Sequence, residues 1–212
     1  MRAGLRGLYA ITDPRLAPGE ALFTAVEVAL RGGARILQYR NKAADGATRL
    51  REAGRLSRLC RAHGALFLVN DDPALAQAVG AHGVHLGRDD PDVARARDLL
   101  GPEGIVGVSC YNELERARAA AAAGADYVAF GRFFPSHTKP EAVQAHPDLI
   151  RRAKAELGLP VVAIGGITPE NGRTLIEAGA DMLAVIHGLF GQPDVEAQAA
   201  RYARLFESPP GS

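Results

Sequence analysis

Four Gly-Ala dipeptides at similar spacing along the chain each follow a helix-like segment and precede a short apolar run. The four glycines are separated by 47, 44 and 55 residues. Glycine suits the end of a helix because it readily adopts left-handed backbone conformations. The pattern therefore indicates a strand–helix–strand–helix unit of about 50 residues, repeated four times. The dipeptides are Gly33-Ala34, Gly80-Ala81, Gly124-Ala125 and Gly179-Ala180, and we expect Gly64, Gly104 and Gly158 to end the helices between them.

Short apolar runs alternate with longer helical patterns throughout the chain. Eight strands alternating with eight helices are typical of a single-domain (β/α)8 TIM barrel. An open doubly wound sheet is the alternative, but the repeat is regular and no G-x-G-x-x-G motif follows the first strand. The barrel should span residues 1–207, with residues 208–212 as a frayed tail. The expected strands are Leu8–Ile11, Ile36–Leu37, Phe67–Val69, Val84–Leu86, Ile105–Val108, Tyr127–Phe130, Val161–Ile164 and Met182–Ile186. The expected helices are Ala21–Arg31, Thr48–His63, Pro73–Val79, Pro91–Leu100, Glu113–Ala123, Asp148–Glu156, Pro169–Ala178 and Asp194–Phe206.

Composition limits the class of protein. The chain has 212 residues, 47% of them hydrophobic, so it can bury a substantial core as one domain. A formal net charge of +1 argues against a broad basic surface for nucleic acid or an anionic membrane. The apolar runs are far shorter than the roughly 20 residues of a membrane span. The two cysteines, Cys60 and Cys110, fit neither a disulfide framework nor a metal site, so we expect a cytoplasmic protein.

Polar side chains follow several of the expected strands, where each strand meets the next loop. In a (β/α)8 barrel these strand ends lie at one face and carry the functional groups. Two carboxylates, one arginine and two lysines gathered there would hold a divalent cation and a polyphosphate, which indicates an enzyme. The residues are Gln38, Arg40 and Lys42, then Asn70 and Asp71, Asp90, Ser109, and finally Thr138 and Lys139.

Gln38, Arg40 and Lys42 alternate with Tyr39 and Asn41. A period of two places the first three on one face of an extended segment. Arginine offers phosphate oxygens a planar fork, lysine offers a mobile point charge, and glutamine offers a heterocycle a donor and an acceptor. A polar loop exposed to water would show the same pattern.

Lysine is rare in this chain, accounting for three of 25 basic residues. Two of the three, Lys42 and Lys139, follow expected strands, and this placement favours a site that uses a compact ammonium group. The third, Lys154, falls on an expected outer helix and should contribute little to activity.

Asp71 and Asp90 follow neighbouring strands and offer hard oxygen ligands. Such a pair without His–Cys spacing suits Mg²⁺, which usually keeps waters and shares phosphate oxygens. Each also stands close to an Asp-Pro step, which is typical of a helix start. The carboxylates could therefore cap helices, bind metal, or do both. His85, on the strand between them, gives no ligand spacing of its own and is expected to orient a neighbouring group.

Glycine-containing loops follow the last two expected strands. Gly165-Gly166 precedes Thr168 and Pro169, which fit the N-cap and the first residue of a helix. His187-Gly188 follows the eighth strand. Glycine amides beside a helix N-terminus would cradle a monophosphate, in the loops where barrels often hold one.

Seven segments, in order along nearly the whole chain, resemble those of the thiamine-phosphate synthase family. Each segment alone is weak, whereas the ordered set is specific. The segments are Leu8-Tyr9-Ala10-Ile11-Thr12-Asp13, Gln38-Tyr39-Arg40-Asn41-Lys42, Asn70-Asp71-Asp72, Gly83-Val84-His85-Leu86-Gly87-Arg88-Asp89-Asp90, Gly107-Val108-Ser109, Thr138-Lys139 and Ala163-Ile164-Gly165-Gly166-Ile167.

The resemblance implies a transferase that joins hydroxymethylpyrimidine diphosphate to thiazole phosphate, with Mg²⁺ as cofactor. Diphosphate would leave first to give a pyrimidine-stabilised carbocation, which the thiazole nitrogen then captures. By the same resemblance Asp71 and Asp90 would bind the metal, and Gln38 would contact the pyrimidine. Arg40, Lys42, Asn70, Ser109 and Lys139 would hold the diphosphate, and Thr138, Gly166, Ile186 and His187 would border the thiazole phosphate.

Three positions depart from the family pattern, at Arg132, Ser136 and His187. They cluster around the second substrate, so a thiazole tautomerase of the same superfamily is the alternative. Tautomerases typically lose the metal and diphosphate residues that this chain keeps, which favours the synthase. A non-catalytic regulator that binds phosphate would also fit a barrel of this kind. The sequence predicts no particular oligomeric state.

Overall fold

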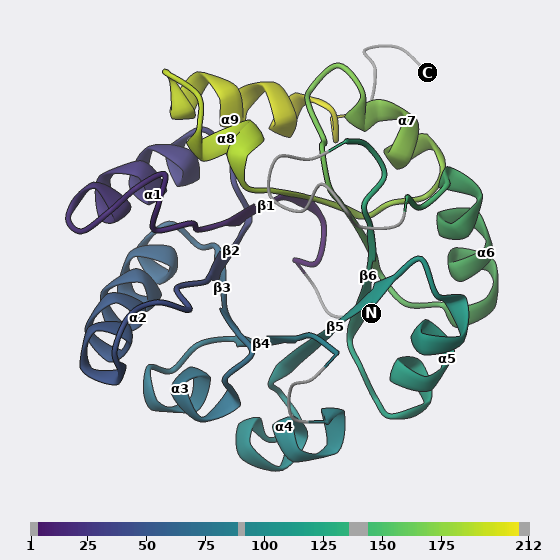
Figure 1. The fold of residues 1–212 in the computed structure, drawn as a ribbon, viewed down its shortest axis with the longest axis horizontal. Helices are drawn as coiled ribbons and strands as arrows, with labels where there is room; N and C mark the ends of the chain where they lie inside the picture. The colour runs from purple at the N-terminus through teal and green to yellow at the C-terminus, as the bar shows by residue number, and fades with distance from the viewer. Residues whose placement is uncertain (1–3, 89–91, 136–143, 208–212) are drawn as a thin grey trace.

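The computed structural model describes residues 4–88, 92–135 and 144–207, whose eight parallel strands close into a barrel. Each strand pairs with its neighbours in sequence, and β8 closes the barrel on β1 with Leu8 beside Leu183. Figure 1 shows the helices as a ring around the strands. The fold expected from the repeat is confirmed. The strands are β1 (Gly7–Ile11), β2 (Ile36–Tyr39), β3 (Leu66–Asn70), β4 (Gly83–Leu86), β5 (Ile105–Tyr111), β6 (Tyr127–Gly131), β7 (Val161–Ile164) and β8 (Met182–Val185).

Aspartates begin four of the helices. Asp45, Asp72, Asp92 and Asp194 each accept the backbone N–H of the residue three positions later, which satisfies one otherwise unpaired donor. The helices are α1 (Ala21–Arg31), α2 (Gly46–Ala62), α3 (Pro73–Ala78), α4 (Val93–Leu100), α5 (Leu114–Ala122), α6 (Pro147–Leu157), α7 (Gly172–Glu177), α8 (His187–Phe190) and α9 (Val195–Arg204).

The observed helices differ from the expected ones at several ends, and three differences are the most informative. Helix α4 begins at Val93 because Asp92 provides its cap, two residues later than expected. Helix α7 begins at Gly172, because Thr168 and Asn171 exchange hydrogen bonds and form a turn before it. The short helix α8 after β8 has no counterpart in the sequence pattern.

The glycines of the four Gly-Ala dipeptides all have left-handed backbone angles, with φ between +61° and +110°. This agrees with their expected position at the ends of helices. Gly104 is an exception to the expected series, since Gly101, at φ +72°, ends α4 instead. A side chain at Gly104 would collide with Leu100, so close packing explains that glycine.

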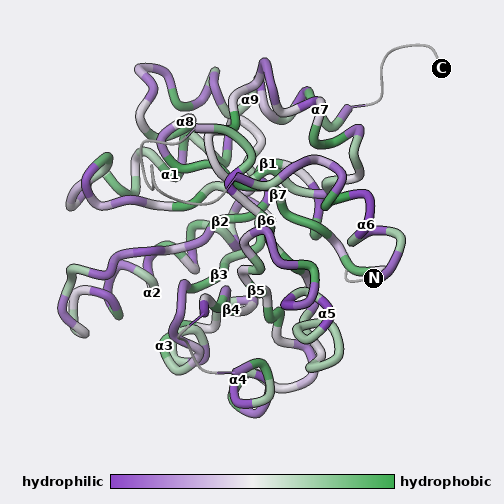
Figure 2. The backbone as a smooth tube through the Cα atoms, turned by 45° about the vertical axis from the view of Figure 1, so that its right-hand side comes forward, coloured by the Kyte–Doolittle hydropathy of each residue, from purple (hydrophilic) through white to green (hydrophobic). Residues whose placement is uncertain are grey.

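Two separate apolar clusters follow from the alternation along the strands. Tyr9, Ile36, Leu68 and Tyr127 belong to the smaller cluster, inside the barrel. The larger cluster lies between the strands and the helices. Figure 2 shows long hydrophobic stretches in the strands and mixed colouring in the helices around them. In the part of the chain that the structure describes, no helix combines the length and apolar character required to cross a membrane.

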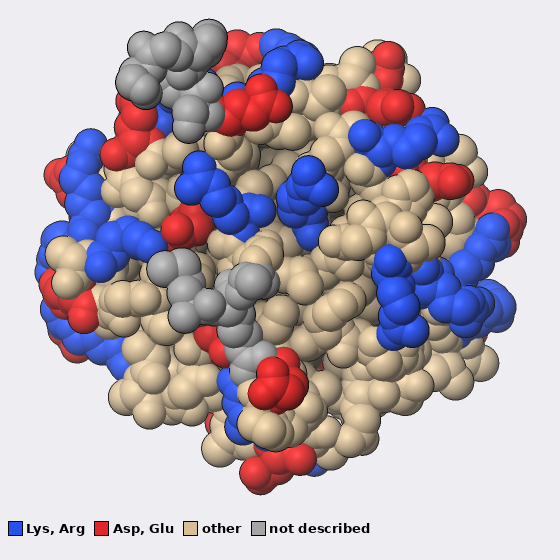
Figure 3. Space-filling model, turned by 180° about the vertical axis from the view of Figure 1, so that it is seen from behind, with Lys and Arg blue, Asp and Glu red and all other residues tan. Residues whose placement is uncertain are grey.

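Charged side chains of both signs are interspersed on the face opposite to the view of Figure 1 (Figure 3). This distribution agrees with the formal net charge of +1. The tail at residues 208–212, expected to fray, lies outside the described residues.

Candidate functional site

The segment after β2 presents alternate side chains to different neighbours. Tyr39 and Asn41 both donate to the Glu52 carboxylate on α2, at 2.7 and 3.0 Å. Gln38 instead donates to Tyr9 inside the barrel, and Lys42 pairs with a carboxylate after β3. Glu52 is buried, and its two hydrogen bonds fix the outward half of the segment. The alternation expected from the sequence therefore holds for these four side chains.

Arg40 lies between Tyr39 and Asn41 in the sequence, and its backbone is positioned by the residue that follows β1. Its N–H donates to Thr12 Oγ1 at 2.8 Å, and the Thr12 hydroxyl donates back to the Arg40 carbonyl at 3.3 Å. Asp13 lies nearby and is 4% exposed. Its pKa is lowered mainly by a hydrogen bond from Arg15, with a smaller contribution from the charge of Arg40.

The adjacent aspartates at the end of β3 have different roles. Asp72 caps α3 and pairs with Arg49, whereas Asp71 pairs with Lys42, with Nζ 2.6 Å from Oδ2. Asp71 has a left-handed backbone, with φ 65°, which is uncommon for a residue other than glycine. Strained conformations of this kind concentrate at functional sites. Helix capping therefore accounts for Asp72 but not for Asp71.

A pocket of about 510 Å³ opens beside the ends of β2 and β3, a size typical of small-molecule sites. Cationic and anionic side chains both line it. Among the described residues that form its wall, neither Gln38 nor Ser109 takes part. The lining residues are Tyr39, Asn41, Lys42, Arg49, Asn70, Asp71, Asp72, Pro73, Ala74, Arg95 and Leu99.

A second group of candidate residues is joined by buried hydrogen bonds across the barrel interior. Gln38 Nε2 donates to the Tyr9 hydroxyl at 2.7 Å, which lies 2.9 Å from the Tyr127 hydroxyl. The Tyr127 hydroxyl lies 2.8 Å from His85 Nδ1, and His85 Nε2 lies 2.8 Å from Ser109 Oγ. The expectation that His85 orients a neighbour is confirmed. Five side chains from β1, β2, β4, β5 and β6 thus form one polar chain.

Burial keeps the members of this chain neutral. It lowers the pKa of His85 to about 4, opposed by the nearby Asp71 charge, and raises the pKa of Tyr9 to about 12. Burial also raises the pKa of Tyr127 well above its ordinary value. The Tyr127 ring stacks on His85 and occupies the space that a side chain at Gly107 would need.

Ser109 lies where β5 departs from regular pairing with β6, at a register shift between Ser109 and Tyr111. Helix α5 fixes this strand end, because Arg116 donates to the Ser109 carbonyl at 2.7 Å and to the Gly87 carbonyl at 2.9 Å. The Ser109 side chain is half-buried. The Ser109 side chain is therefore held by the hydrogen bond with His85 and is still accessible at the barrel mouth.

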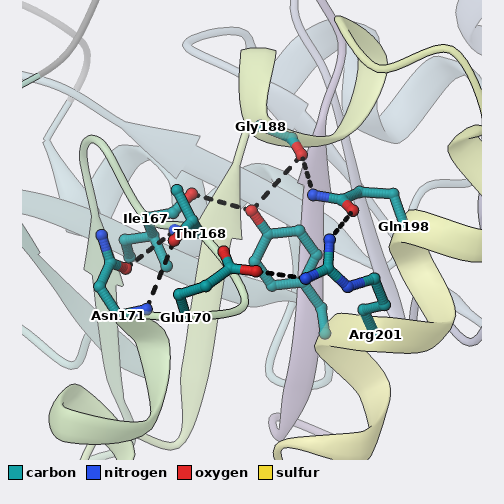
Figure 4. A network of polar contacts seen from close by, with 8 residues as sticks. Ile167, Thr168, Glu170, Asn171, Gly188, Gln198 and Arg201 are labelled. Carbon is teal, nitrogen blue, oxygen red and sulfur yellow. Dashed lines mark hydrogen bonds and ion pairs between the residues drawn. The ribbon is translucent and has the colours of Figure 1, made fainter.

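The loops after β7 and β8 form a third group, supported by α9 (Figure 4). Gln198 donates to the Gly188 carbonyl at 3.0 Å, and Arg201 contacts both Gln198 and Glu170. In the β7 loop, a side chain at Gly166 would collide with the carbonyls of Phe134 and Pro135. Its left-handed backbone and this close approach both require glycine.

Apart from Arg40, which is held at Thr12 after β1, the described candidate residues fall into three groups. The first two are adjacent, since the Asp71 backbone N–H donates to the His85 carbonyl at 2.8 Å. Asp90, Thr138 and Lys139 lie outside the described residues, as does Ser136. Within the described part, no three His, Cys, Asp or Glu side chains gather as a metal site. The groups are Lys42, Asn70 and Asp71 at the pocket, Gln38 and Ser109 on the buried chain, and Gly166, Ile186 and His187 after β7 and β8.

Sequence reasoning missed several residues of the site region. Arg49 and Arg95 were not among the residues expected at the strand ends, yet both line the pocket. Tyr9 and Tyr127 were counted only as strand residues. A tyrosine on the inward face of a strand, beside inward Gln or His, would have been a usable signal, because a buried hydroxyl needs a partner.

The profile of a family described as "Thiamine monophosphate synthase" matches residues 8–189. The thiamine-phosphate synthase of Nitrosococcus oceani is 53% identical over 98% of this chain and 96% of its own length. That of Thiobacillus denitrificans is also 53% identical, over 99% of both chains. The chain belongs to the thiamine monophosphate synthase family. It is therefore an enzyme of the transferase type.

A solved structure of the thiamine monophosphate synthase family extends this assignment to three dimensions. Thiamine phosphate pyrophosphorylase from Pyrococcus furiosus superposes with a TM-score of 0.86 at 36% identity. The superposition covers 95% of this chain and 96% of that one. Family, fold and enzyme class expected from the seven segments are thus confirmed.

Proposed function

We propose that the protein joins hydroxymethylpyrimidine diphosphate to thiazole phosphate, forming thiamine phosphate and releasing pyrophosphate. The observation that carries this proposal is membership of the thiamine monophosphate synthase family over residues 8–189. The contact between Lys42 and Asp71 beside a pocket of about 510 Å³ supports it, because it joins a phosphate-binding cation to a metal-binding carboxylate.

The diphosphate side of the site would use Arg40, Lys42, Asn70, Ser109 and Lys139. Departure of diphosphate needs positive charge and hydrogen-bond donors at the leaving oxygens more than it needs a nucleophile. The Lys42 side chain is largely exposed, whereas Arg40 is held through its backbone by Thr12. Charge at the leaving group would then lower the barrier to breaking the carbon–oxygen bond.

The residues at this place also fit a magnesium ion. Asp71 offers a half-buried carboxylate and Asn70 an amide oxygen at the same pocket, and Asp90 would be the second carboxylate. Mg²⁺ is usually held by one or two carboxylates together with substrate phosphates. When bound, the ion would supply further positive charge at the leaving diphosphate.

The pyrimidine side would use Gln38. One amide hydrogen of Gln38 is committed to Tyr9, which leaves its second hydrogen and its carbonyl oxygen for the edge of a heterocycle. Loss of diphosphate would give a carbocation stabilised by the pyrimidine ring, and the thiazole nitrogen would capture it. The thiazole phosphate would lie against Gly166, Ile186, His187 and Thr138.

The carbocation step has a direct kinetic test. Substrates with electron-withdrawing ring substituents should react more slowly in proportion to their withdrawing power, since positive charge develops on the ring. When the thiazole phosphate is saturating, the rate of carbon–oxygen cleavage should not depend on the thiazole. Rates that are insensitive to the ring substituent but depend on thiazole basicity would contradict this order of steps and favour direct displacement.

The expected cytoplasmic location also stays a proposal. Its support is that Cys60 and Cys110 are both free thiols, each buried in the outer core. Fractionation of cells that express the protein would test it.

A further inference from the structure

Five polar side chains form one unbranched series of hydrogen bonds inside the barrel. We call it the interior chain, and it runs through Gln38, Tyr9, Tyr127, His85 and Ser109. A hydroxyl has one proton to donate, and a neutral imidazole also has one. Each of these groups therefore donates to one neighbour at most, which couples the hydrogen bonds along the interior chain.

His85 and Tyr9 are buried, which favours neutral groups, and two arrangements then run in a single direction along the interior chain. In the first direction Tyr9 donates to Tyr127, Tyr127 donates to Nδ1 of His85, and the Nε2–H of His85 donates to Ser109. In the second direction Ser109 donates to Nε2, the Nδ1–H of His85 donates to Tyr127, and Tyr127 donates to Tyr9. A third arrangement, with His85 and Tyr9 both donating to Tyr127, would leave the buried Tyr127 proton without an acceptor in the hydrogen bonds of the described residues.

The Gln38 end distinguishes the two directions. Gln38 donates to the Tyr9 hydroxyl, so the second direction would bring two donors to Tyr9. The Tyr9 proton would then have no acceptor in the hydrogen bonds of the described residues, although the side chain is only 1% exposed. Proteins rarely leave a buried donor unpaired. The first direction instead leaves the spare proton on Ser109, which is half-buried at the barrel mouth and can reach water or a ligand.

We propose that Gln38 sets the direction of the interior chain, so that His85 is held as the Nε2–H tautomer and Ser109 keeps its hydroxyl proton to donate to a bound anion. Tyr9, Tyr127 and His85 are then positioning residues that act on Ser109 without touching the diphosphate. The statement about the anion rests on the proposed function. The statement about the tautomer does not, because it follows from the hydrogen bonds alone.

The tautomer is measured directly by nitrogen NMR of protein labelled with ¹⁵N-histidine. The chain contains six histidines, and a His85→Gln variant identifies the signal of His85. We expect a protonated Nε2 and an unprotonated Nδ1 in the wild-type protein at neutral pH. A protonated Nδ1, or a doubly protonated ring, would overturn the proposal.

The role of Gln38 is tested by Gln38→Glu, which keeps the shape and replaces the donor with an acceptor. The spectrum is recorded at about pH 9 so that a buried carboxyl is ionised. Tyr9 would then donate to Glu, and the whole interior chain would reverse, placing the His85 proton on Nδ1.

Two variants serve as controls. Tyr9→Phe interrupts the interior chain, so adding Gln38→Glu to Tyr9→Phe should leave the His85 tautomer unchanged. Tyr39→Phe removes a tyrosine hydroxyl that is buried outside the interior chain, and it should also leave the His85 tautomer unchanged. Circular dichroism verifies that each variant is folded. An Nε2–H ring in folded Gln38→Glu would overturn the role of Gln38.

The consequence for the ligand is measured by calorimetry with inorganic pyrophosphate and Mg²⁺. Ser109→Ala should weaken binding about tenfold through the lost donor. Gln38→Glu should weaken pyrophosphate binding by a similar factor. In the Tyr9→Phe background the same substitution should weaken binding clearly less, because only its added negative charge still acts there. Equal weakening in both backgrounds would overturn the link between Gln38 and Ser109. A wild-type protein with the expected tautomer that does not bind pyrophosphate would instead contradict the proposed function.

Discussion

The side chains of Lys42 and Asp71, which follow neighbouring strands, form an ion pair with Nζ 2.6 Å from Oδ2. The Lys42 side chain is 62% exposed, so the pair is worth at most about 1 kcal/mol. A doubly charged metal and a diphosphate could therefore separate it easily. Each partner would then contact a ligand of higher charge, so the pair should offer little resistance to substrate binding.

The metal assignment is tested by comparing the two neighbouring aspartates. Asp71→Asn should raise the Mg²⁺ concentration for half-maximal activity about tenfold or more, since a charged ligand is lost. Asparagine tolerates the left-handed backbone at this position, so the fold should persist.

Asp72→Asn is the matched control, because it removes the same charge from the same pocket. Its amide oxygen can still cap α3, and the Mg²⁺ requirement should change little. Activity titrations against Mg²⁺ provide the comparison. Equal shifts in both variants would mean that pocket charge, not ligation, determines the metal requirement.

Lys42 should matter for turnover and Lys154 for stability. Lys42→Met removes a charge at the leaving group and should lower kcat/KM about 10²–10³-fold. Lys154 bridges to Asp181, which also accepts the Val161 N–H at the start of β7. Lys154→Met should therefore lower Tm while kcat stays near the wild-type value.

This result would agree with the expectation that Lys154 contributes little to activity, and the loss of its ion pair with Asp181 at the start of β7 would explain the lower Tm. Steady-state kinetics and thermal unfolding of both variants separate the two effects. A normal kcat/KM in Lys42→Met would remove Lys42 from the diphosphate site.

The acid sensitivity of stability should depend in part on His82. Burial, followed by the nearby Arg61 charge, lowers the pKa of His82 below its ordinary 6.5. The unfolded chain therefore takes up a proton at higher pH than the folded chain does. The contribution of His82 to stability is present above pH 6.5 and is lost as pH falls below 6.5 toward the lowered pKa.

His82→Asn does not titrate but can still accept the Phe67 N–H that His82 Nδ1 accepts at 3.0 Å. Urea unfolding at about pH 7 and about pH 5 should show a smaller loss of stability for the variant. The same loss in both proteins would show that His82 does not contribute to acid sensitivity.

The fold was predictable because its signals are local and repeated. The Gly-Ala dipeptides, the helix-capping aspartates and the apolar runs each fix a short segment, and the barrel follows from their order. The turn before α7 was not predictable in the same way. Thr168 and Asn171 compete with helix hydrogen bonding, so a cap-like sequence forms a turn instead.

The site was predictable at strand ends and not in the barrel interior. The contact between Lys42 and Asp71 follows from adjacent strands, whereas the partners of His85 depend on which side chains meet across the barrel. Tyr127 reaches His85 only because Gly107 leaves room for its ring. A relationship of this kind joins three strands, β4, β5 and β6, and has no signature in any one of them.

The central claim is tested most directly by the products of a single reaction mixture. Purified protein with Mg²⁺, hydroxymethylpyrimidine diphosphate and thiazole phosphate should form thiamine phosphate and pyrophosphate in equal amounts, measured by chromatography. A mixture without metal should form little of either. Isomerisation of the thiazole without thiamine phosphate would contradict the account and favour a tautomerase, and binding without any product would favour a regulator.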